Sequence, residues 1–302
     1  MLERLRDALI DRRIRSKAAI HHTPLDRYRV RIARDVHQHE DAFRLLHVAY
    51  AFQGIENIRS DKLRITPQHV LPEATVFVAY EGEQCVGTMT VTLDSPAGIP
   101  VEKDYPEAIE RLRNHGSTLV EYGSLAVVRR CWSTGVVVLL NIAASYWAIH
   151  MLEATDIVMG VNPKALPLYR SLYGFRPLGK PKQHAELTAP VAAMSLRIAD
   201  GLAHTRKYWP KPMASGRTIA EHYAIELPEC IEIPARLSSR EVTRWKLPRS
   251  VFQELFINRS DRLDTLDPTT LAYLKRWRSD QTLQASENTK DFFIKGSPHA
   301  TW

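Results

Sequence analysis

The stretch from Leu119 to Phe175 decides the fold. It reads LVEYGSLAV at 119–127, RRCWSTGVVVLLNIAASYWAIHML at 129–152, DIVMGV at 156–161 and NPKALPLYRSLYGF at 162–175. These segments predict a strand, a long apolar helix, a second strand and a second helix. The order puts one carboxylate, Glu121, in an otherwise apolar strand and one phenol, Tyr169, on the last helix. We therefore expect a base and an acid that can face each other across a reacting group.

Patterns on both sides of this stretch extend it into a mixed α/β domain. Alternation predicts strands at 28–33, 75–80, 86–93, 183–187 and 191–198, and helical spacing predicts helices after Asp35 and at 105–115. Strands and helices in this order predict the α/β class (α+β mixed sheet), with one central mixed sheet and helices on both of its faces. We assign residues 25–200 to this core.

The two ends of the chain differ from the core in composition. Residues 1–24 predict a basic N-terminal arm, an amphipathic helix that ends at a His-His-Thr-Pro break. Residues 201–302 predict a mainly helical C-terminal extension, whose short helices begin near Pro248 and Pro268.

The charge balance favours an acidic partner. The 302 residues carry a net charge of +7, with a cluster at 12–17 and a pair at Arg129 and Arg130. An acidic carrier protein or a transient contact with an anionic membrane surface would suit this charge, although a dispersed excess is also typical of an ordinary solvated surface. Because no zinc finger or aromatic RNA-reading strand is present, we expect no nucleic acid partner.

Cysteine and histidine usage predicts neither a metal site nor a disulfide. Cys85, Cys131 and Cys230 have no CxxC spacing, and the histidines show no ligand pattern. Charged residues at the start and polar interruptions in the apolar stretch 136–152 argue against an export signal and a membrane span. We therefore expect a cytoplasmic protein without a metal.

Two motifs resemble the GNAT acyltransferase superfamily. Leu125-Ala126-Val127 is similar to its Leu-x-Val strand end, and 162–175 is similar to its Asn-x-x-Ala-x-x-x-Tyr…Gly-Phe signature, with one extra residue before the glycine and a proline at Pro167. The strand 120–127 also resembles the Glu-x-Ser-Arg-Phe strand of acyl-homoserine-lactone synthases, with Gly and Ser in place of Ser and Arg.

The closest resemblance is to long-chain N-acyl amino acid synthases. They share this strand, the preceding Gly-Thr-Met-Thr-Val at 87–91 and the loop 94–100, so the similarity spans about residues 28–198. It implies transfer of a long-chain acyl group to the amino group of a small amino acid. An acetyl-CoA-dependent N-acetyltransferase and a non-enzymatic lipid or carrier sensor stay open as alternatives.

The loop before the long helix bears on the acyl donor. Enzymes that use coenzyme A cradle its pyrophosphate on a glycine-rich loop at a helix N-terminus, but here only Gly135 is kept. The resemblance therefore implies acyl-phosphopantetheine on acyl carrier protein as the donor, with acyl-CoA as the alternative, and no permanently bound cofactor. The residues expected to bind the donor are Arg129, Arg130, Trp132, Gly135 and Asn162.

The resemblance also implies roles for single residues. Glu121, with a pKa raised by burial, would take a proton from the acceptor ammonium, and Tyr169 would protonate the departing thiolate. A backbone N–H of Val127 or Val128 at a strand bulge would stabilise the oxyanion. In the alternatives, Glu121 pairs with an arginine and Tyr169 only packs on the sheet.

Substrate contacts are predicted from position alone. Met89, Val91, Trp132 and Trp147 are candidates for an apolar acyl tunnel, although each could equally be plain core. The acceptor's carboxylate calls for a cation at the mouth of the site, and Arg59 and Arg64 are the candidates.

Overall fold

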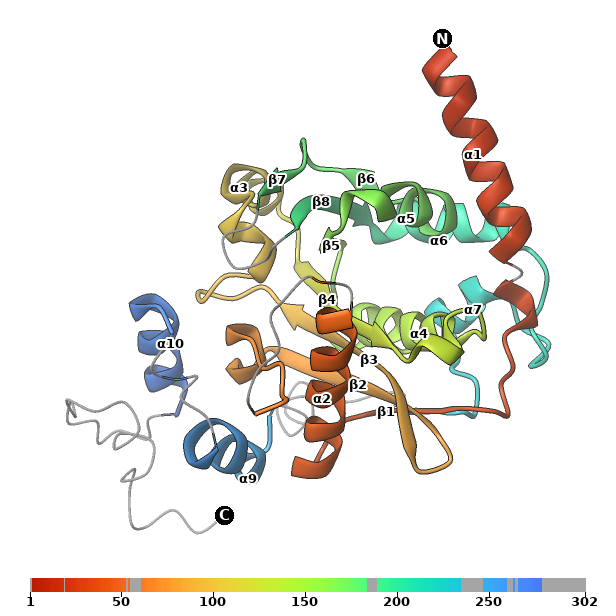
Figure 1. Ribbon diagram of the computed structural model, residues 1–302. Helices are drawn as coiled ribbons and strands as arrows, with labels where there is room; N and C mark the ends of the chain where they lie inside the picture. The colour runs from red at the N-terminus through yellow and green to blue at the C-terminus, as the bar shows by residue number, and fades with distance from the viewer. Residues whose placement is uncertain are drawn as a thin grey trace.

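The computed structural model describes residues 2–18, 20–52, 54, 61–183, 189–234, 247–259, 263 and 266–278. In this part of the chain, nine strands form one mixed sheet with helices on both faces (Figure 1). The strands are β1 (Arg29–Ile32), β2 (Ala74–Glu81), β3 (Gln84–Leu93), β4 (Leu119–Val127), β5 (Asp156–Val161), β6 (Arg176–Pro177), β7 (Lys182–Gln183), β8 (Pro190–Arg197) and β9 (Ile231–Glu232). The predicted α/β class with a mixed sheet is confirmed.

The sheet opens in its middle, between β4 and β5. Its order is β6-β8-β5-β4-β3-β2-β1-β9, and β7 pairs with β8. The neighbours β4 and β5 run parallel but pair only from Leu119–Asp156 to Glu121–Val158. Both strands continue past these pairs, so their carboxyl ends separate. A gap between two parallel strands at this end is where α/β sheets commonly place a ligand.

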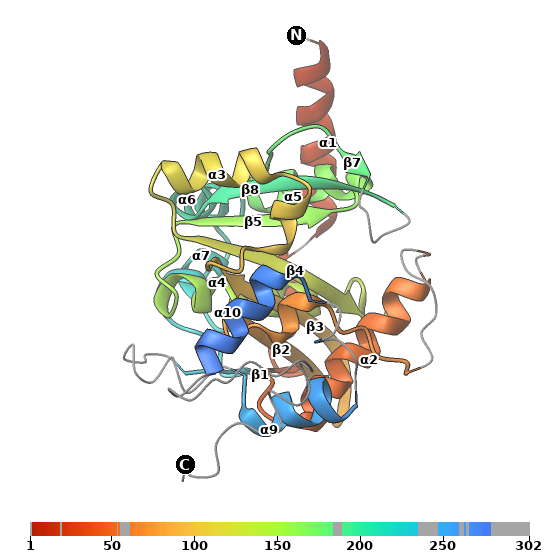
Figure 2. The same cartoon turned by 90° about the vertical axis from the view of Figure 1, so that its left-hand side faces the viewer.

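The helices form two layers, and Figure 2 looks onto the sheet from the side that carries α2, α9 and α10. One face of the sheet is covered by α4 (Val136–His150), α5 (Leu166–Tyr173), α6 (Ile198–Tyr208) and α7 (Ile219–Ala224). The other face carries α2 (Val36–Phe52), α3 (Pro106–Asn114), α9 (Arg249–Phe252), the π-helix η6 (Gln253–Asn258) and α10 (Pro268–Arg278). Because α4 lies between the sheet and α7, it is buried along most of its length, which explains its apolar sequence.

A β-bulge interrupts β4 beside the gap. Thr88 pairs with Ala126 and Thr90 with Gly123, so two residues of β4, Ser124 and Leu125, lie opposite a single residue of β3. Ser124 adopts a left-handed conformation, with φ at 49°. Bulges of this kind bend a strand and release backbone groups from the ladder.

The ends of the chain pack against the core. Helix α1 (Leu2–Ala18) joins α5 through an ion pair between Asp11 Oδ1 and Arg170 Nη2 at 3.0 Å. At the other end, α6 begins directly after β8, and β9 pairs with β1 in parallel. Packing is therefore continuous across residue 200, the boundary predicted from composition. Of the helices described, none is long and apolar enough to cross a membrane.

Candidate active site

Two cavities meet at the bulge of β4. The first, which we call the Glu121 cavity, has a volume of about 480 Å³ and lies on the side of α2 and α3. The second, the Tyr169 cavity, has a volume of about 280 Å³ and lies between β4, β5, α4 and α5. The two share the lining residues Tyr50, Gly123, Ser124 and Gly160. A molecule in one cavity would therefore lie next to a molecule in the other.

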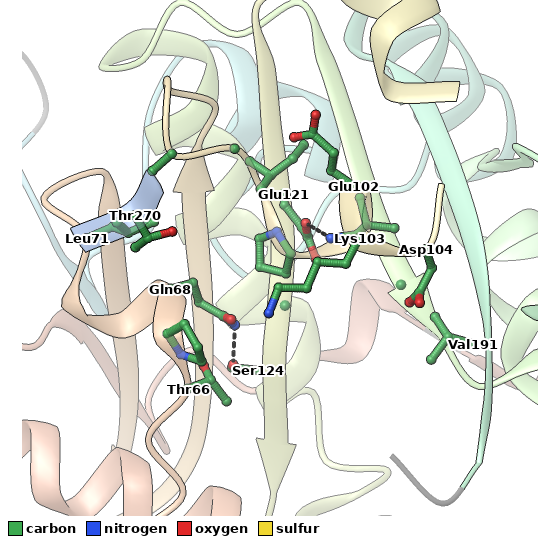
Figure 3. Close-up of a pocket in the computed structure, with 18 of the residues that line it drawn as sticks. Thr66, Gln68, Leu71, Glu102, Lys103, Asp104, Glu121, Ser124, Val191 and Thr270 are labelled. Atoms are coloured by element: carbon green, nitrogen blue, oxygen red, sulfur yellow. Dashed lines mark hydrogen bonds between the residues drawn. The ribbon is translucent and has the colours of Figure 1, made fainter. Parts of the chain in front are cut away.

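Glu121 is a buried carboxylate at the wall of the first cavity. Its side chain is 5% exposed, and Oε2 accepts the backbone N–H of Val101 at 2.7 Å (Figure 3). Burial raises its pKa to about 8; the nearby Asp104 carboxylate adds to this shift, and the hydrogen bond from Val101 opposes it. Within the described residues, no arginine or lysine forms an ion pair with Glu121. The arginine-paired alternative therefore finds no support in this part of the chain.

Gly123 leaves space beside the carboxylate. It lies two residues further on the same face of β4, and a Cβ built on it would lie 3.9 Å from Glu121 Oε1 and from Gln68 Nε2. Gln68 Nε2 donates to Ser124 Oγ at 3.2 Å, across the junction of the cavities. Because glycine has no side chain, the space beside Oε1 of Glu121 stays open at position 123.

The Glu121 cavity also holds a guanidinium. Arg64 lines it, is 9% exposed, and its Cζ lies 4.2 Å from the centre of the Tyr50 ring. Such a planar, stacked cation is suited to a carboxylate ligand. The structure therefore brings Arg64 and Glu121 into one cavity, whereas Arg59 lies outside the described residues.

Tyr169 faces the second cavity. Helix α5 begins at Leu166, so Pro167 stands in its first turn, where it is tolerated, and leaves the helix intact. The Tyr169 ring packs edge-on against Phe175 at 6.2 Å. Burial raises its pKa to about 12, and the neighbouring Tyr50 adds to the shift. The phenol therefore stays protonated near neutral pH and can donate a proton.

Of the residues expected to bind the donor, only Asn162 lines one of the two cavities. Asn162 lines the Tyr169 cavity and caps the N–H of Lys164. Arg129, Arg130, Trp132 and Gly135 line neither this cavity nor the Glu121 cavity. The guanidinium of Arg130 bonds Glu81 and Gln84 in the β2–β3 turn.

Trp132 and Gly135 lie in the loop that leads into α4. Trp132 is 55% exposed and donates from Nε1 to the carbonyl of Val127 at 3.0 Å. Gly135 precedes α4, and a Cβ on it would lie 2.5 Å from Cγ2 of Thr23. The N-terminal segment thus packs on the one glycine that the loop keeps.

Of the acyl-tunnel candidates, only one lines the Tyr169 cavity. Met89 lines the Tyr169 cavity. Val91 and Trp147 lie in the packed core instead, with Trp147 against Phe77 at 6.4 Å. Trp132 is largely exposed and belongs to the loop before α4.

The bulge changes the choice of oxyanion donor. The N–H of Val128 donates to Val86 O at 2.9 Å, so it is already engaged. Because antiparallel pairs alternate, the N–H of Val127 points away from β3, but Val127 does not line the Tyr169 cavity. Ser124 and Leu125 do line it. The backbone at the bulge therefore lines the cavity, whereas the two residues predicted as oxyanion donors do not.

Several cavity residues were not predicted from the sequence. Tyr122, Asn141 and Tyr173 line the Tyr169 cavity, and Asp267, just before α10, and Thr270 of α10 line the Glu121 cavity. Alternation along β4 would have placed Tyr122 opposite Glu121. No local signal marks Asp267 and Thr270, because their position depends on how the C-terminal segment folds back. Within the residues described, no cluster of His, Cys, Asp or Glu side chains could hold a metal ion.

Comparisons with solved structures place this site in a known fold. The structure of FeeM, an N-acyl amino acid synthase from uncultured soil microbes, is 22% identical, with a TM-score of 0.52, over 59% of this chain and 95% of that one. A CoA-dependent acyl-homoserine lactone synthase, BjaI, is 14% identical, with a TM-score of 0.47, over 72% and 98%. A GNAT acetyltransferase from Streptococcus pneumoniae is 17% identical, with a TM-score of 0.37, over 56% and 98%.

The sequence comparison is more specific. None of the curated proteins matches this chain. The family model for the N-acyl amino acid synthase FeeM matches residues 41–197, a range that contains both Glu121 and Tyr169. Because this match covers more than half of the chain, the protein belongs to the FeeM family of N-acyl amino acid synthases and is an acyltransferase.

Proposed function

We propose that the protein transfers a long-chain acyl group from acyl carrier protein to the amino group of an amino acid. The observation that carries this proposal is the position of Glu121: it is buried, has no ion-pair partner among the described residues, and lies on the wall of a cavity that Arg64 also lines and that adjoins a second cavity. The first cavity would hold the amino acid, and the second would hold the acyl thioester.

In the proposed reaction Glu121 acts as general base. The amine of a free amino acid is protonated near neutral pH and has no lone pair with which to attack a thioester. Oε1 of Glu121 takes one proton, and the amine nitrogen then forms a bond to the carbonyl carbon. A pKa of about 8 suits this task, because a base works best when its pKa lies near the working pH.

The rest of the reaction takes place in the Tyr169 cavity. The carbonyl oxygen becomes an oxyanion, which the backbone N–H groups of the bulge at Ser124 and Leu125 would stabilise. The oxyanion then collapses, the C–S bond breaks, and the thiolate takes a proton from Tyr169. The Tyr169 phenolate takes the second proton of the nitrogen and becomes a phenol again, the proton on Glu121 passes to solvent, and the products are an amide and a free thiol.

The acceptor would be recognised through its carboxylate. A guanidinium that is buried and stacked, as that of Arg64 is, binds a carboxylate more strongly than an exposed one. The same cavity also holds Lys103 and Asp104, so it suits a zwitterion better than an apolar amine.

The loop before α4 favours a donor with a single phosphate. Thr23 packs on Gly135, and Tyr28 Oη donates to Thr134 Oγ1 at 2.8 Å. These side chains lie against the loop that a pyrophosphate would need to approach closely. Phosphopantetheine on acyl carrier protein has one phosphate and needs less of this surface.

The surroundings of the Tyr169 cavity suit an acidic carrier with an apolar patch. The helices α2 and α5, which border it, expose the large apolar side chains Val48, Phe52 and Leu168, and the loop before α4 exposes Trp132. Cζ of Arg129 lies 5.5 Å from the centre of the Phe52 ring. A surface that combines apolar and basic groups would give both contact area and electrostatic attraction to such a partner.

One experiment separates the possible donors. The protein is incubated with mixed amino acids and, in parallel reactions, with long-chain acyl carrier protein, long-chain acyl-CoA or acetyl-CoA, and products are identified by mass spectrometry. We expect long-chain N-acyl amino acids from the carrier and little product from either CoA ester. Acetylated product from acetyl-CoA alone would overturn the proposal, and so would the absence of any acylated amine. Protein carrying Glu121→Gln is the matched control.

A further inference from the structure

A third, smaller space continues from the Tyr169 cavity into the C-terminal extension. It has a volume of about 30 Å³ and shares the lining residues Tyr122, Asn141 and Tyr173 with that cavity. Its far wall comes from α6 and α7, through Ile198, Gly201, Leu202, Thr205 and Tyr223. All five lie beyond residue 197, where the family match ends. We call this space the α7 crevice.

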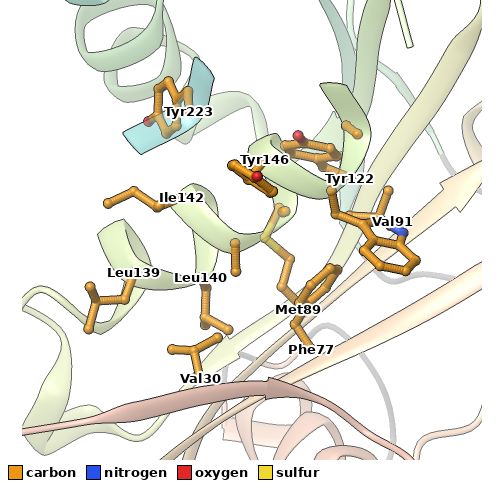
Figure 4. Packing of buried hydrophobic residues seen from close by; sticks show 14 of the residues in the cluster. Val30, Phe77, Met89, Val91, Tyr122, Leu139, Leu140, Ile142, Tyr146 and Tyr223 are labelled. Carbon is orange, nitrogen blue, oxygen red and sulfur yellow. The ribbon is translucent and has the colours of Figure 1, made fainter. Parts of the chain in front are cut away.

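Tyr223 lines the α7 crevice directly behind the residues that the crevice shares with the cavity. The residue is buried, and its Oη donates to Asn141 Oδ1 at 2.6 Å. Figure 4 shows Tyr223 at the edge of the core cluster to which Tyr122 and Tyr146 belong. Because Asn141 lines both spaces and Tyr223 lines only the crevice, their bond holds the boundary from the crevice side.

This boundary has a physical consequence for an extended apolar ligand. A chain that passed the boundary would have to displace the Tyr223 ring and separate its hydroxyl from Asn141. Both polar groups would then be buried without partners, which opposes binding. A chain that stops short of the boundary keeps the bond intact and gains affinity with every methylene that it buries.

We propose that Tyr223 limits the length of the acyl chain that the protein accepts, because its ring, from the C-terminal extension, fills the space directly behind the end of the Tyr169 cavity. This inference rests on the proposed function and adds to it a residue that determines specificity. It also gives α6 and α7 a role: they form the end wall of the acyl site.

The test uses the full-length protein and a series of saturated fatty acids from octanoate to octadecanoate as probes. Binding is measured by calorimetry for the unaltered protein and for Tyr223→Ala, Tyr223→Leu and Tyr223→Phe, after circular dichroism has confirmed folding. Affinity should rise about fourfold for each added methylene and then level off at a limiting length. We expect this limit to move at least one two-carbon step longer in Tyr223→Ala and Tyr223→Leu.

The Tyr223→Phe variant is the matched control. The phenylalanine ring fills the same space in the α7 crevice, so the limiting length should stay within one two-carbon step of the original. If Tyr223→Ala does not fold, Tyr223→Leu carries the test alone. Folded variants with an unchanged limit would overturn the proposal, and so would an unaltered protein that binds none of the fatty acids.

The binding series is independent of turnover, so the two proposals can fail separately. If the protein yields no N-acyl product but the limiting fatty-acid length increases in Tyr223→Leu, the proposed function is wrong and the role of Tyr223 in limiting chain length is kept. If acyl carrier protein supports synthesis, the product lengths should follow the binding limit in each variant. Products that keep their length while the binding limit moves would contradict the proposed role in specificity.

Discussion

The two faces of β4 differ in character although they belong to one strand. Glu121 faces a cavity that holds charged side chains, whereas the next residue, Tyr122, faces an apolar space beside α4. Successive residues of a strand point to opposite faces, so this alternation keeps the two environments apart. The bulge at Ser124 joins them. One strand can thus keep a zwitterion and a lipid chain apart and still bring their reacting atoms together.

Removing the charge from the polar face should have the largest effect. In Glu121→Gln, we expect turnover to fall about 10²- to 10⁴-fold, because the amine loses its base. The amide can still accept the N–H of Val101, so the fold should be kept. Steady-state product formation and thermal unfolding check this expectation. Turnover equal to that of the unaltered protein would remove Glu121 from the chemistry.

Removing the guanidinium should affect binding more than chemistry. In Arg64→Gln, we expect the KM for an amino acid to rise about 10- to 100-fold with a similar kcat, because a charged hydrogen bond to the carboxylate is lost. The control is an acceptor amine without a carboxylate, for which the substitution should change little. An equal loss for both acceptors would show that Arg64 supports the cavity rather than the ligand.

On the apolar side, the phenol of Tyr169 should matter less. We expect Tyr169→Phe to lower kcat about tenfold or less, because a thiol with a pKa near 8.5 leaves as a thiolate without much help. The phenylalanine ring keeps the contact with Phe175. Single-turnover rates with long-chain acyl carrier protein measure this step directly. A loss of kcat as large as that of Glu121→Gln would indicate that Tyr169 contributes as much to catalysis as Glu121 does.

The smallest expected effect is on stability. The pKa of Glu121 is raised from 4.5 to about 8, so the folded state holds this proton more tightly than the unfolded state does. Its contribution to stability is therefore present below about pH 4.5 and is lost as pH rises to about 8.

Denaturant unfolding across this pH range measures the contribution. The free energy of unfolding of the unaltered protein should decline relative to that of Glu121→Gln, by about 1.4 kcal/mol for each pH unit between the two pKa values. Buried His39 and His69, with pKa values lowered to about 4 and about 3, titrate equally in both proteins and cancel in the difference. A constant difference would indicate that the pKa of Glu121 is not raised.

Part of this comparison was readable from the sequence. A single glutamate in an apolar strand, followed by an apolar helix, a strand and a helix with a tyrosine, is a local pattern, and it predicted the order from β4 to α5. Met89 and Arg64 were likewise found on cavity walls. These positions follow from spacing along single elements, which the sequence records directly.

Other features depend on segments that meet only in the folded chain. Arg130 is engaged by Glu81 from a distant turn, and Gly135 is covered by Thr23 from the N-terminal segment. Neither contact can be predicted from the local sequence pattern, because its two residues lie far apart in the chain. An apolar residue such as Trp147 reads the same in a core as on a tunnel wall, so its position could not be predicted.

The most direct test follows kcat/KM for the amino acid against pH, with long-chain acyl carrier protein as donor, in the unaltered protein and in Glu121→Gln. For the unaltered protein we predict a rise with an apparent pKa near 8, because the carboxylate must be ionised to act. In Glu121→Gln this component should be absent, leaving only the ionisation of the amine. Two profiles with the same shape and the same pKa would contradict the role of Glu121 as the base where the two faces meet.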